Sequence, residues 1–74
     1  MIHEVRNKFA ISSHQVWMPG CYESKRAANY AFRFSDRELR TLQNMANERN
    51  GGYDGVITMN DLKEYRKNNK VKVL

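Results

Sequence analysis

Apolar and polar residues alternate near the start of the chain in the manner of a β-strand. Within residues 2–11, Phe9 and Ile11 fall on one side of this alternation, and Lys8 and Ala10 fall on the other. Such a pattern buries one face of a strand and leaves the opposite face toward solvent. We therefore predict a strand within residues 2–11.

A turn and two short strands are predicted to follow. Residues 12–14, two serines and a histidine, are typical of a loop, and residues 15–17 fit a second strand. Pro19-Gly20 predicts a type II turn, because proline fixes φ at the first central position and glycine accepts the positive φ of the second. Cys21-Tyr22 is expected to form a short return strand. The N-terminal third should therefore be a β-hairpin or a three-stranded antiparallel sheet.

The segment 24–34 has the spacing of an amphipathic helix. Ser24 is placed to cap it, since a serine hydroxyl accepts a hydrogen bond from a free amide of the first turn. The apolar positions recur at steps of three and four residues, and they are Ala27, Ala28, Ala31 and Phe34. The opposite side is mostly basic and polar, with Lys25, Arg26, Asn29 and Arg33. The alanines favour a helix and allow close packing against a sheet or another helix.

A second helix is predicted over 36–49, and a capping box marks its start. In that box Ser35 caps forward and Glu38 reaches back to the serine amide. The apolar stripe consists of Leu39, Leu42, Met45 and Ala46, and the outer face carries Arg37, Arg40 and Asn44. The Asn-Gly-Gly sequence at 50–52 ends the helix near Arg49.

A third helix is predicted over 58–68, where Thr58 and Asp61 form a second capping box. Its inward residues are Met59, Leu62 and Tyr65. The tail at 70–74 alternates like a strand, and it is expected either to add an edge strand or to fray. The whole chain, 1–74, thus reads as one small α+β domain, with a sheet packed on three short helices at 24–34, 36–49 and 58–68.

The connection between the second and third helices is similar in spacing to an EF-hand loop. With Asn50 at the first position, Gly55 falls at the sixth, Ile57 at the eighth and Asp61 at the twelfth. Gly52, at the third position, offers no side-chain oxygen, and Asp61 replaces the longer bidentate glutamate. We therefore interpret the segment as a helix–loop–helix connection in which Asp61 closes a capping box, and we predict no metal site.

Composition limits the classes of function. The 74 residues carry 13 Lys and Arg against 8 Asp and Glu, and the net charge of +5 favours acidic partners: nucleic acid, an acidic protein face or anionic lipid. The single cysteine, Cys21, excludes an intrachain disulfide, fits a reducing compartment and is interpreted as a packing residue. The isolated His3 and His14 complete neither a zinc site nor a nucleophile–base pair. We find no signal peptide or membrane-length apolar stretch, so we expect a cytoplasmic protein. Because no zinc site and no nucleophile–base pair can be assembled, we also expect that the protein is not an enzyme and has no cofactor.

The candidate binding residues lie mostly between residues 17 and 36. Aromatic and basic side chains are interleaved there, and such side chains concentrate binding energy at protein interfaces. Phe32 lies off the alanine stripe and is expected to face solvent. Trp17, the only tryptophan, is either an exposed anchor or the largest core residue, and we favour the core. The predicted partner-binding or nucleic-acid-binding residues are Trp17, Lys25, Arg26, Asn29, Tyr30, Phe32, Arg33, Arg37 and Arg40.

Two arrangements would direct these residues toward DNA. As a helix–turn–helix, the nearly contiguous helices at 24–34 and 36–49 would present Arg37 and Arg40 at the start of a recognition helix, although acidic neighbours there repel phosphate. Alternatively, residues 5–34, a sheet with a turn and then an alanine-rich helix, resemble the arm-binding domains of phage integrases. That resemblance implies strands in the major groove, with contacts from Arg6, Lys8, Trp17, Lys25 and Arg26.

The string WMPGCYESKRAANYAFRFSD, residues 17–36, is similar to short proteins encoded by phages and prophages. The resemblance implies one of two roles: a regulator that binds DNA, or a protein that binds and disables a host machine such as a nuclease or an immune effector. We expect the second role, in which a basic protein without catalysis engages a host protein or a protein–nucleic-acid complex in the host cytoplasm. Binding of DNA, with or without sequence specificity, is the alternative.

Overall fold

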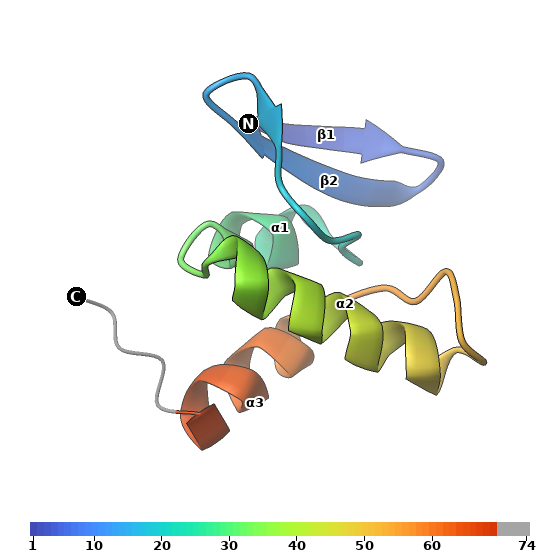
Figure 1. Ribbon diagram of the computed structural model, residues 1–74. Helices are drawn as coiled ribbons and strands as arrows, with labels where there is room; N and C mark the ends of the chain where they lie inside the picture. The colour runs from blue at the N-terminus through green and yellow to red at the C-terminus, as the bar shows by residue number, and fades with distance from the viewer. Residues whose placement is uncertain (70–74) are drawn as a thin grey trace.

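The computed structural model describes residues 1–69 and has a three-stranded antiparallel sheet and three helices. The strands are β1 (Ile2–Val5), β2 (Lys8–Ser13) and β3 (Val16–Trp17), in the spatial order β1-β2-β3. The helices are α1 (Lys25–Ala31), α2 (Asp36–Arg49) and α3 (Met59–Asn69). All three helices lie on one side of the sheet (Figure 1), which confirms the predicted α+β architecture. Within residues 1–69, no helix combines the length and the apolar character needed to cross a membrane.

Two tight turns build the sheet; the first was not predicted, and the second lies at the end of the loop predicted at 12–14. Arg6 and Asn7 join β1 to β2 with φ of 50° and 65°, and His14 and Gln15 join β2 to β3 with φ of 53° and 65°. Two consecutive residues with positive φ are typical of type I′ turns, whose twist matches that of the flanking strands. Neither pair contains the Asn-Gly or Asp-Gly sequence that favours such a turn, so local composition did not indicate this turn type.

The predicted boundaries of the first strand and the following loop are therefore wrong. Residues 2–11 form two paired strands instead of one, and β2 continues through Ser13 across the predicted loop at 12–14. β2 is the central strand, with Ile11 opposite Ile2 of β1. The physical reason is pairing: cross-strand hydrogen bonds extend β2 through serines whose own preference is for turns.

Register assigns each strand residue to one of two faces. Ile11 is fully buried and Phe9 packs against the core, so their side of β2 faces the helices. Alternate residues and their directly opposed partners must point away from the helices. We call this uncovered surface the outer sheet face; it consists of His3, Val5, Lys8, Ala10, Ser12 and Trp17.

Tyr22 joins the sheet to the loop that precedes α3. It forms an antiparallel bridge with Phe9 and a parallel bridge with Ile57, so the predicted return strand is reduced to one bridged residue. The Tyr22 side chain is fully buried, and its hydroxyl donates a 2.7 Å hydrogen bond to the Pro19 carbonyl. Burial raises the pKa of this phenol. Gly20 has the predicted positive φ, 112°, and a Cβ at this position would overlap the Tyr22 hydroxyl.

α1 begins as predicted but ends at Ala31, before the predicted end at residue 34. The Ser24 hydroxyl accepts a 3.2 Å hydrogen bond from the Ala27 amide, as expected of an N-cap. After Ala31 the Phe34 amide donates to a carbonyl only three residues back, which tightens the chain into a 3₁₀-type turn. Apolar periodicity does not distinguish this turn from another turn of α-helix. The predicted apolar stripe is nevertheless correct: Ala27, Ala28, Ala31 and Phe34 are all buried.

Both predicted capping boxes are present. In α2 the Ser35 amide donates to Glu38 Oε1 at 2.8 Å, and the Glu38 amide donates to Ser35 Oγ at 3.3 Å. In α3 the Thr58 amide donates to Asp61 Oδ2 at 2.9 Å, and the Asp61 amide donates to Thr58 Oγ1 at 3.1 Å. These reciprocal bonds satisfy amides that have no partner within the helix.

The inward stripes of α2 and α3 agree with the prediction at all positions but one. Leu39, Leu42, Ala46 and Leu62 are buried, and Met59 and Tyr65 are partly buried against the core. Met45, predicted in the α2 stripe, is 54% exposed. It lines a groove between α2 and α3. The predicted tail at 70–74 lies outside the described residues.

Gly55 brings the loop after α2 against the backbone of that helix. A Cβ on Gly55 would lie closer than 3.0 Å to backbone atoms of both Ala46 and Asn47. The Asn47 side-chain oxygen accepts a 2.8 Å hydrogen bond from the Gly55 amide, and the Gln43 amide group donates to the Gly55 carbonyl at 2.7 Å. The Gln43 side-chain oxygen also accepts a 2.8 Å hydrogen bond from the Cys21 amide. Asn47 and Gln43 of α2 therefore both hold the loop at Gly55, and Gln43 also holds the segment before Tyr22.

Candidate functional site

The outer side of α1 carries a row of basic and polar side chains. Lys25, Arg26 and Asn29 project from the helix, and Arg33 follows in the turn after it; all four are exposed. The helix itself contains no acidic residue to offset these charges. The row faces solvent because the buried alanines fix which side of the helix meets the core, as the sequence predicts.

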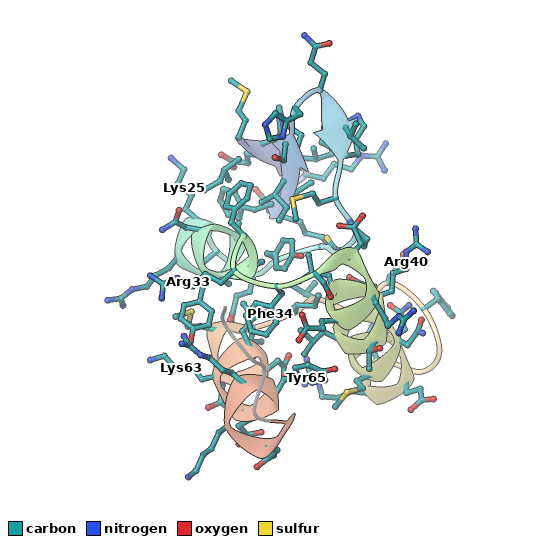
Figure 2. All side chains as sticks on the ribbon, turned by 60° about the vertical axis from the view of Figure 1, so that its left-hand side comes forward. Lys25, Arg33, Phe34, Arg40, Lys63 and Tyr65 are labelled. Carbon is teal, nitrogen blue, oxygen red and sulfur yellow. The ribbon has the colours of Figure 1, made fainter. Side chains whose placement is uncertain are left out.

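α3 extends this positive surface alongside α1. Its basic residues Lys63, Arg66 and Lys67 are three and four positions apart, so they share one side of the helix. α1 and α3 pack against each other, and Figure 2 shows Lys25, Arg33 and Lys63 on the same side of the molecule. We call this surface the α1–α3 basic face; it consists of Lys25, Arg26, Asn29, Tyr30, Arg33, Lys63, Arg66 and Lys67.

Tyr30 links the two helices within this face. Arg66 donates a 3.0 Å hydrogen bond to the Tyr30 hydroxyl, and its guanidinium carbon lies 6.0 Å from the centroid of the ring. The guanidinium carbon of Arg33 lies 5.5 Å from the same centroid. The ring in turn packs on Phe34, with 5.9 Å between centroids. Each cation–π contact at an exposed site contributes about 0.5–1 kcal/mol, and together they hold two guanidinium groups around one tyrosine.

An apolar hollow borders α1 on the side of the sheet. Phe32 is 36% exposed and points away from the alanine stripe, as predicted. With Val16 and Met18 it lines a hollow of about 280 Å³, whose polar rim consists of Ser13 and Asp36. Val16 is 63% exposed, so the apolar wall of the hollow is open to solvent. Phe32 directly precedes Arg33, so this hollow lies next to the C-terminal end of the basic row on α1.

Arg37 and Arg40 do not join the α1–α3 basic face. Both are exposed on the outer side of α2, and Figure 2 shows Arg40 across the molecule from Arg33 and Lys63. α1 packs against α3 and against the sheet, and its contacts with α2 are few. The two helices therefore do not form the packed pair of a helix–turn–helix. The structure divides the predicted binding set, because the turn at 32–35 sends α2 away from the outer side of α1.

Trp17 is exposed, and its expected place in the core is wrong. It is 64% exposed on the outer sheet face, where its ring centroid lies 4.6 Å from that of His3. β3 pairs Trp17 with Ser12, and the alternation that turns Ile11 toward the helices turns both of these residues away. Size favours burial of a tryptophan, but register determines which face it occupies.

The residues implied by the integrase resemblance lie in two places. Lys8 and Trp17 are on the outer sheet face, and Arg6 lies in the turn beside it. Lys25 and Arg26 are on α1, which packs against the opposite face of the sheet. A DNA duplex on the outer sheet face would therefore contact Arg6, Lys8 and Trp17. It would not reach Lys25 and Arg26.

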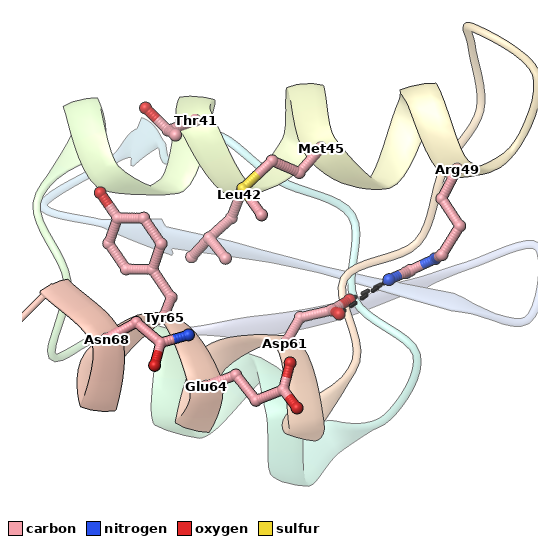
Figure 3. A pocket seen from close by; sticks show the side chains of 8 residues that line it. All are labelled: Thr41, Leu42, Met45, Arg49, Asp61, Glu64, Tyr65 and Asn68. Carbon is pink, nitrogen blue, oxygen red and sulfur yellow. Dashed lines mark hydrogen bonds and ion pairs between the residues drawn. The ribbon is translucent and has the colours of Figure 1, made fainter.

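A groove of about 380 Å³ lies between α2 and α3 (Figure 3). Leu42, Met45 and Tyr65 give it apolar walls, and its rim includes Thr41, Glu64 and Asn68. Arg49 and Asp61 form an ion pair at one end, with Nη1 and Oδ1 2.7 Å apart. The hydrogen bond between them lowers the pKa of Asp61 and raises that of Arg49. The pair joins the end of α2 to the start of α3, which is a structural role.

The EF-hand-like segment is a helix–loop–helix connection, as predicted. The Asn50 side-chain nitrogen donates to the Tyr53 and Asp54 carbonyls at 2.9 and 3.2 Å and so closes the loop on itself. Asp61 is held by Arg49 and by its capping box. Among residues 1–69, no group of three or more His, Cys, Asp or Glu side chains is placed to hold a metal ion.

The prediction of candidate residues omitted the contribution of α3. The shared side of Lys63, Arg66 and Lys67 is visible in their spacing, but only tertiary packing brings Arg66 to Tyr30, 36 positions away.

Comparisons of the chain with family models, with curated proteins and with solved structures find no significant match.

Proposed function

We propose that this chain is a binding protein without catalytic activity that docks through its α1–α3 basic face on an acidic surface of a partner protein. The similarity of residues 17–36 to phage-encoded proteins favours a target in the host cytoplasm, either a protein or a protein–nucleic-acid complex. Occupation of that surface would disable the target in the manner of a host-takeover or counter-defence inhibitor.

The observation that carries the proposal is the apolar hollow at Phe32, the residue next to Arg33 at the end of the basic row of α1. A phosphate backbone offers charge but no apolar group to fill a hollow lined by Phe32, Val16 and Met18. A protein offers both, since an apolar side chain can enter the hollow while neighbouring carboxylates meet Lys25 and Arg33. Interfaces of this kind place apolar contacts beside a charged rim.

The arrangement around Tyr30 favours tight binding of carboxylates. Arg33 and Arg66 are held by ring contacts, and Arg66 also by a hydrogen bond, so less side-chain entropy is lost when a partner orders them. A guanidinium group can bind a carboxylate through two parallel hydrogen bonds. Arginine and tyrosine are also enriched among the residues that dominate interface energies.

The experiment is capture of the partner from host lysate on tagged protein, with and without nuclease, using matched arginine variants. Arg33→Ala removes one guanidinium from the basic face, and Arg40→Ala removes another exposed one from the far side of α2. We expect a captured protein that resists nuclease, is retained by Arg40→Ala, and binds Arg33→Ala at least about tenfold more weakly. Phe32→Ala should weaken binding as well, because it removes a wall of the hollow. Equal binding by all variants would contradict this face.

DNA binding is the second candidate, favoured by the cations that α1 and α3 bring to one face. It predicts recovery of nucleic acid, or loss of the captured proteins on nuclease treatment. It also predicts affinity for duplex DNA that falls steeply between about 50 and about 200 mM salt, because each neutralised phosphate releases counterions. Lys63 and Lys67 would then contribute to affinity as much as the residues of α1.

A further inference from the structure

The outer sheet face has no layer of the described structure packed on it, because all three helices lie on the other side (Figure 1). The solvated face of an antiparallel sheet is ordinarily polar. This one exposes Trp17 by 64% and Val5 by 53%. The two residues lie on different edge strands, with β2 between them. An exposed indole on an uncovered sheet is the feature of this face that the fold does not explain.

The position of the indole is fixed by its neighbours. The His3 ring packs on Trp17 at a tilt of 49°, with 4.6 Å between centroids. His3 Nε2 is also 2.8 Å from the Ser12 hydroxyl, a hydrogen-bond distance, and Ser12 lies directly opposite Trp17. The ring is thus supported on one side, while most of its surface stays open to a ligand.

Cations border the rest of the face. A hollow of about 300 Å³ is lined by Val5, Ala10 and Cys21, together with the two cationic residues Arg6 and Lys8. Lys8 is four residues from Ser12 along β2, and Ser12 lies opposite Trp17. At the usual rise of a strand, about 14 Å therefore separates Lys8 from Trp17.

Acidic side chains are absent from the outer sheet face itself. Glu4 belongs to the opposite face, because it pairs with Phe9, which packs toward the core. Glu23 is the acidic residue near these cations: it lines a second hollow together with Arg6 and Lys8, and it is not one of the residues that line the hollow at Val5 and Ala10. The outer sheet face thus combines an open aromatic ring and an apolar hollow with positive charge.

We propose that the outer sheet face binds single-stranded nucleic acid, with a base stacked on Trp17 and backbone phosphates held by Lys8 and Arg6. Aromatic rings on a sheet and cations along the backbone path are the two elements of single-strand binding that does not depend on sequence. Bases of a duplex stack on each other and cannot reach such a ring. This surface is separate from the α1–α3 basic face, so it goes beyond the proposed protein docking and fits a target that contains both protein and nucleic acid.

The test uses the single tryptophan as its own reporter. An oligothymidylate of about ten nucleotides is titrated into the protein at low salt while Trp17 emission is recorded, and we expect saturable quenching. Anisotropy of the same oligonucleotide carrying a dye then measures the variants. Trp17→Ala should weaken binding by about 5- to 150-fold and Trp17→Phe by much less, since a phenyl ring still stacks. Lys8→Ala should reduce the slope of log K against log salt by about 0.7.

Matched controls distinguish binding at the outer sheet face from binding elsewhere on the protein. Val16→Ala changes the neighbouring residue of β3, which is equally exposed but points to the side of the helices, and it should bind the oligonucleotide as the parent does. Arg40→Ala, which removes an exposed cation from the outer side of α2, should also leave oligonucleotide binding unchanged. Far-UV circular dichroism confirms that each variant is folded. Absence of quenching at about 50 mM salt, or equal affinity of Trp17→Ala and the parent, would overturn the proposal.

Discussion

Replacement of Gly55 by alanine should be among the most destabilising single changes in this chain. The added Cβ would overlap the backbone of Ala46 and Asn47, and backbone atoms cannot move aside as the end of a flexible side chain can. Either the loop or the last turn of α2 must shift. Such a shift would also lengthen the two hydrogen bonds that Asn47 and Gln43 make to the Gly55 backbone.

The expected cost follows from these two effects. Overpacking costs about 1–3 kcal/mol, and each lost hydrogen bond costs about 1 kcal/mol, so Gly55→Ala should lose about 3–5 kcal/mol. A chain of 74 residues has a total stability of about 4–11 kcal/mol. With a dependence of about 1 kcal/mol per molar urea, the unfolding midpoint should fall by at least about 3 M. Urea titration followed by far-UV circular dichroism measures this shift.

Gly51→Ala is the matched control in the same loop. Gly51 has φ of 87°, and a Cβ added there would have no atom within 4 Å, so its replacement meets backbone strain without a clash. That strain costs about 1–2 kcal/mol. If Gly55→Ala lowered the urea midpoint no more than Gly51→Ala does, close approach of the loop to α2 would not be the reason for glycine at position 55.

Three further predictions concern titration and capping. Stability should fall as the pH rises above 10.0, because burial holds the pKa of Tyr22 above that ordinary value and ionisation favours the unfolded chain. The urea midpoint of Tyr22→Phe should therefore fall less at alkaline pH than that of the parent. If Tyr53→Phe, at an exposed tyrosine, reduced this alkaline loss equally, the assignment to Tyr22 would be wrong. Asp61 has a pKa below 3.8, chiefly through its hydrogen bond with Arg49, so it stabilises the fold above that pH and loses this effect as the pH falls further. Asp61→Asn should therefore be less stable at neutral pH and show a shallower acid decline in the same titration, and parallel profiles would refute the assignment. Ser35→Ala should cost about 1 kcal/mol by removing one half of a capping box, and an unchanged thermal midpoint would show that the box contributes nothing.

The helical part of the fold was predictable because its signals are local. Ser24, Ser35 and Thr58 cap helices through hydrogen bonds to residues three positions ahead, so the cap and its partner can be read together in the sequence. The alanine stripe of α1 likewise needs only the helical repeat. Met45 is the exception. The helical repeat places it on the apolar side of α2, but it does not show that α3 leaves Met45 uncovered.

The sheet was predictable in kind but not in boundaries. The turns at Arg6-Asn7 and His14-Gln15 adopt positive φ without glycine, so their identity depends on the pairing of the strands they join. The same pairing decides that Trp17 lies on the outer sheet face, a result that its size and its local sequence did not favour.

The sequence by itself determined the helices, their caps, the exposed cationic row on α1 and the α+β class, since each of these depends on residues within a few positions of one another. Only the tertiary structure decided the composition of the surfaces. Packing of α3 on α1 brought Arg66 to Tyr30, and strand register turned Trp17 outward. The direction of α2 separated Arg40 from Arg33. These outcomes depend on contacts between residues far apart in the chain, and no periodicity along the chain specifies them.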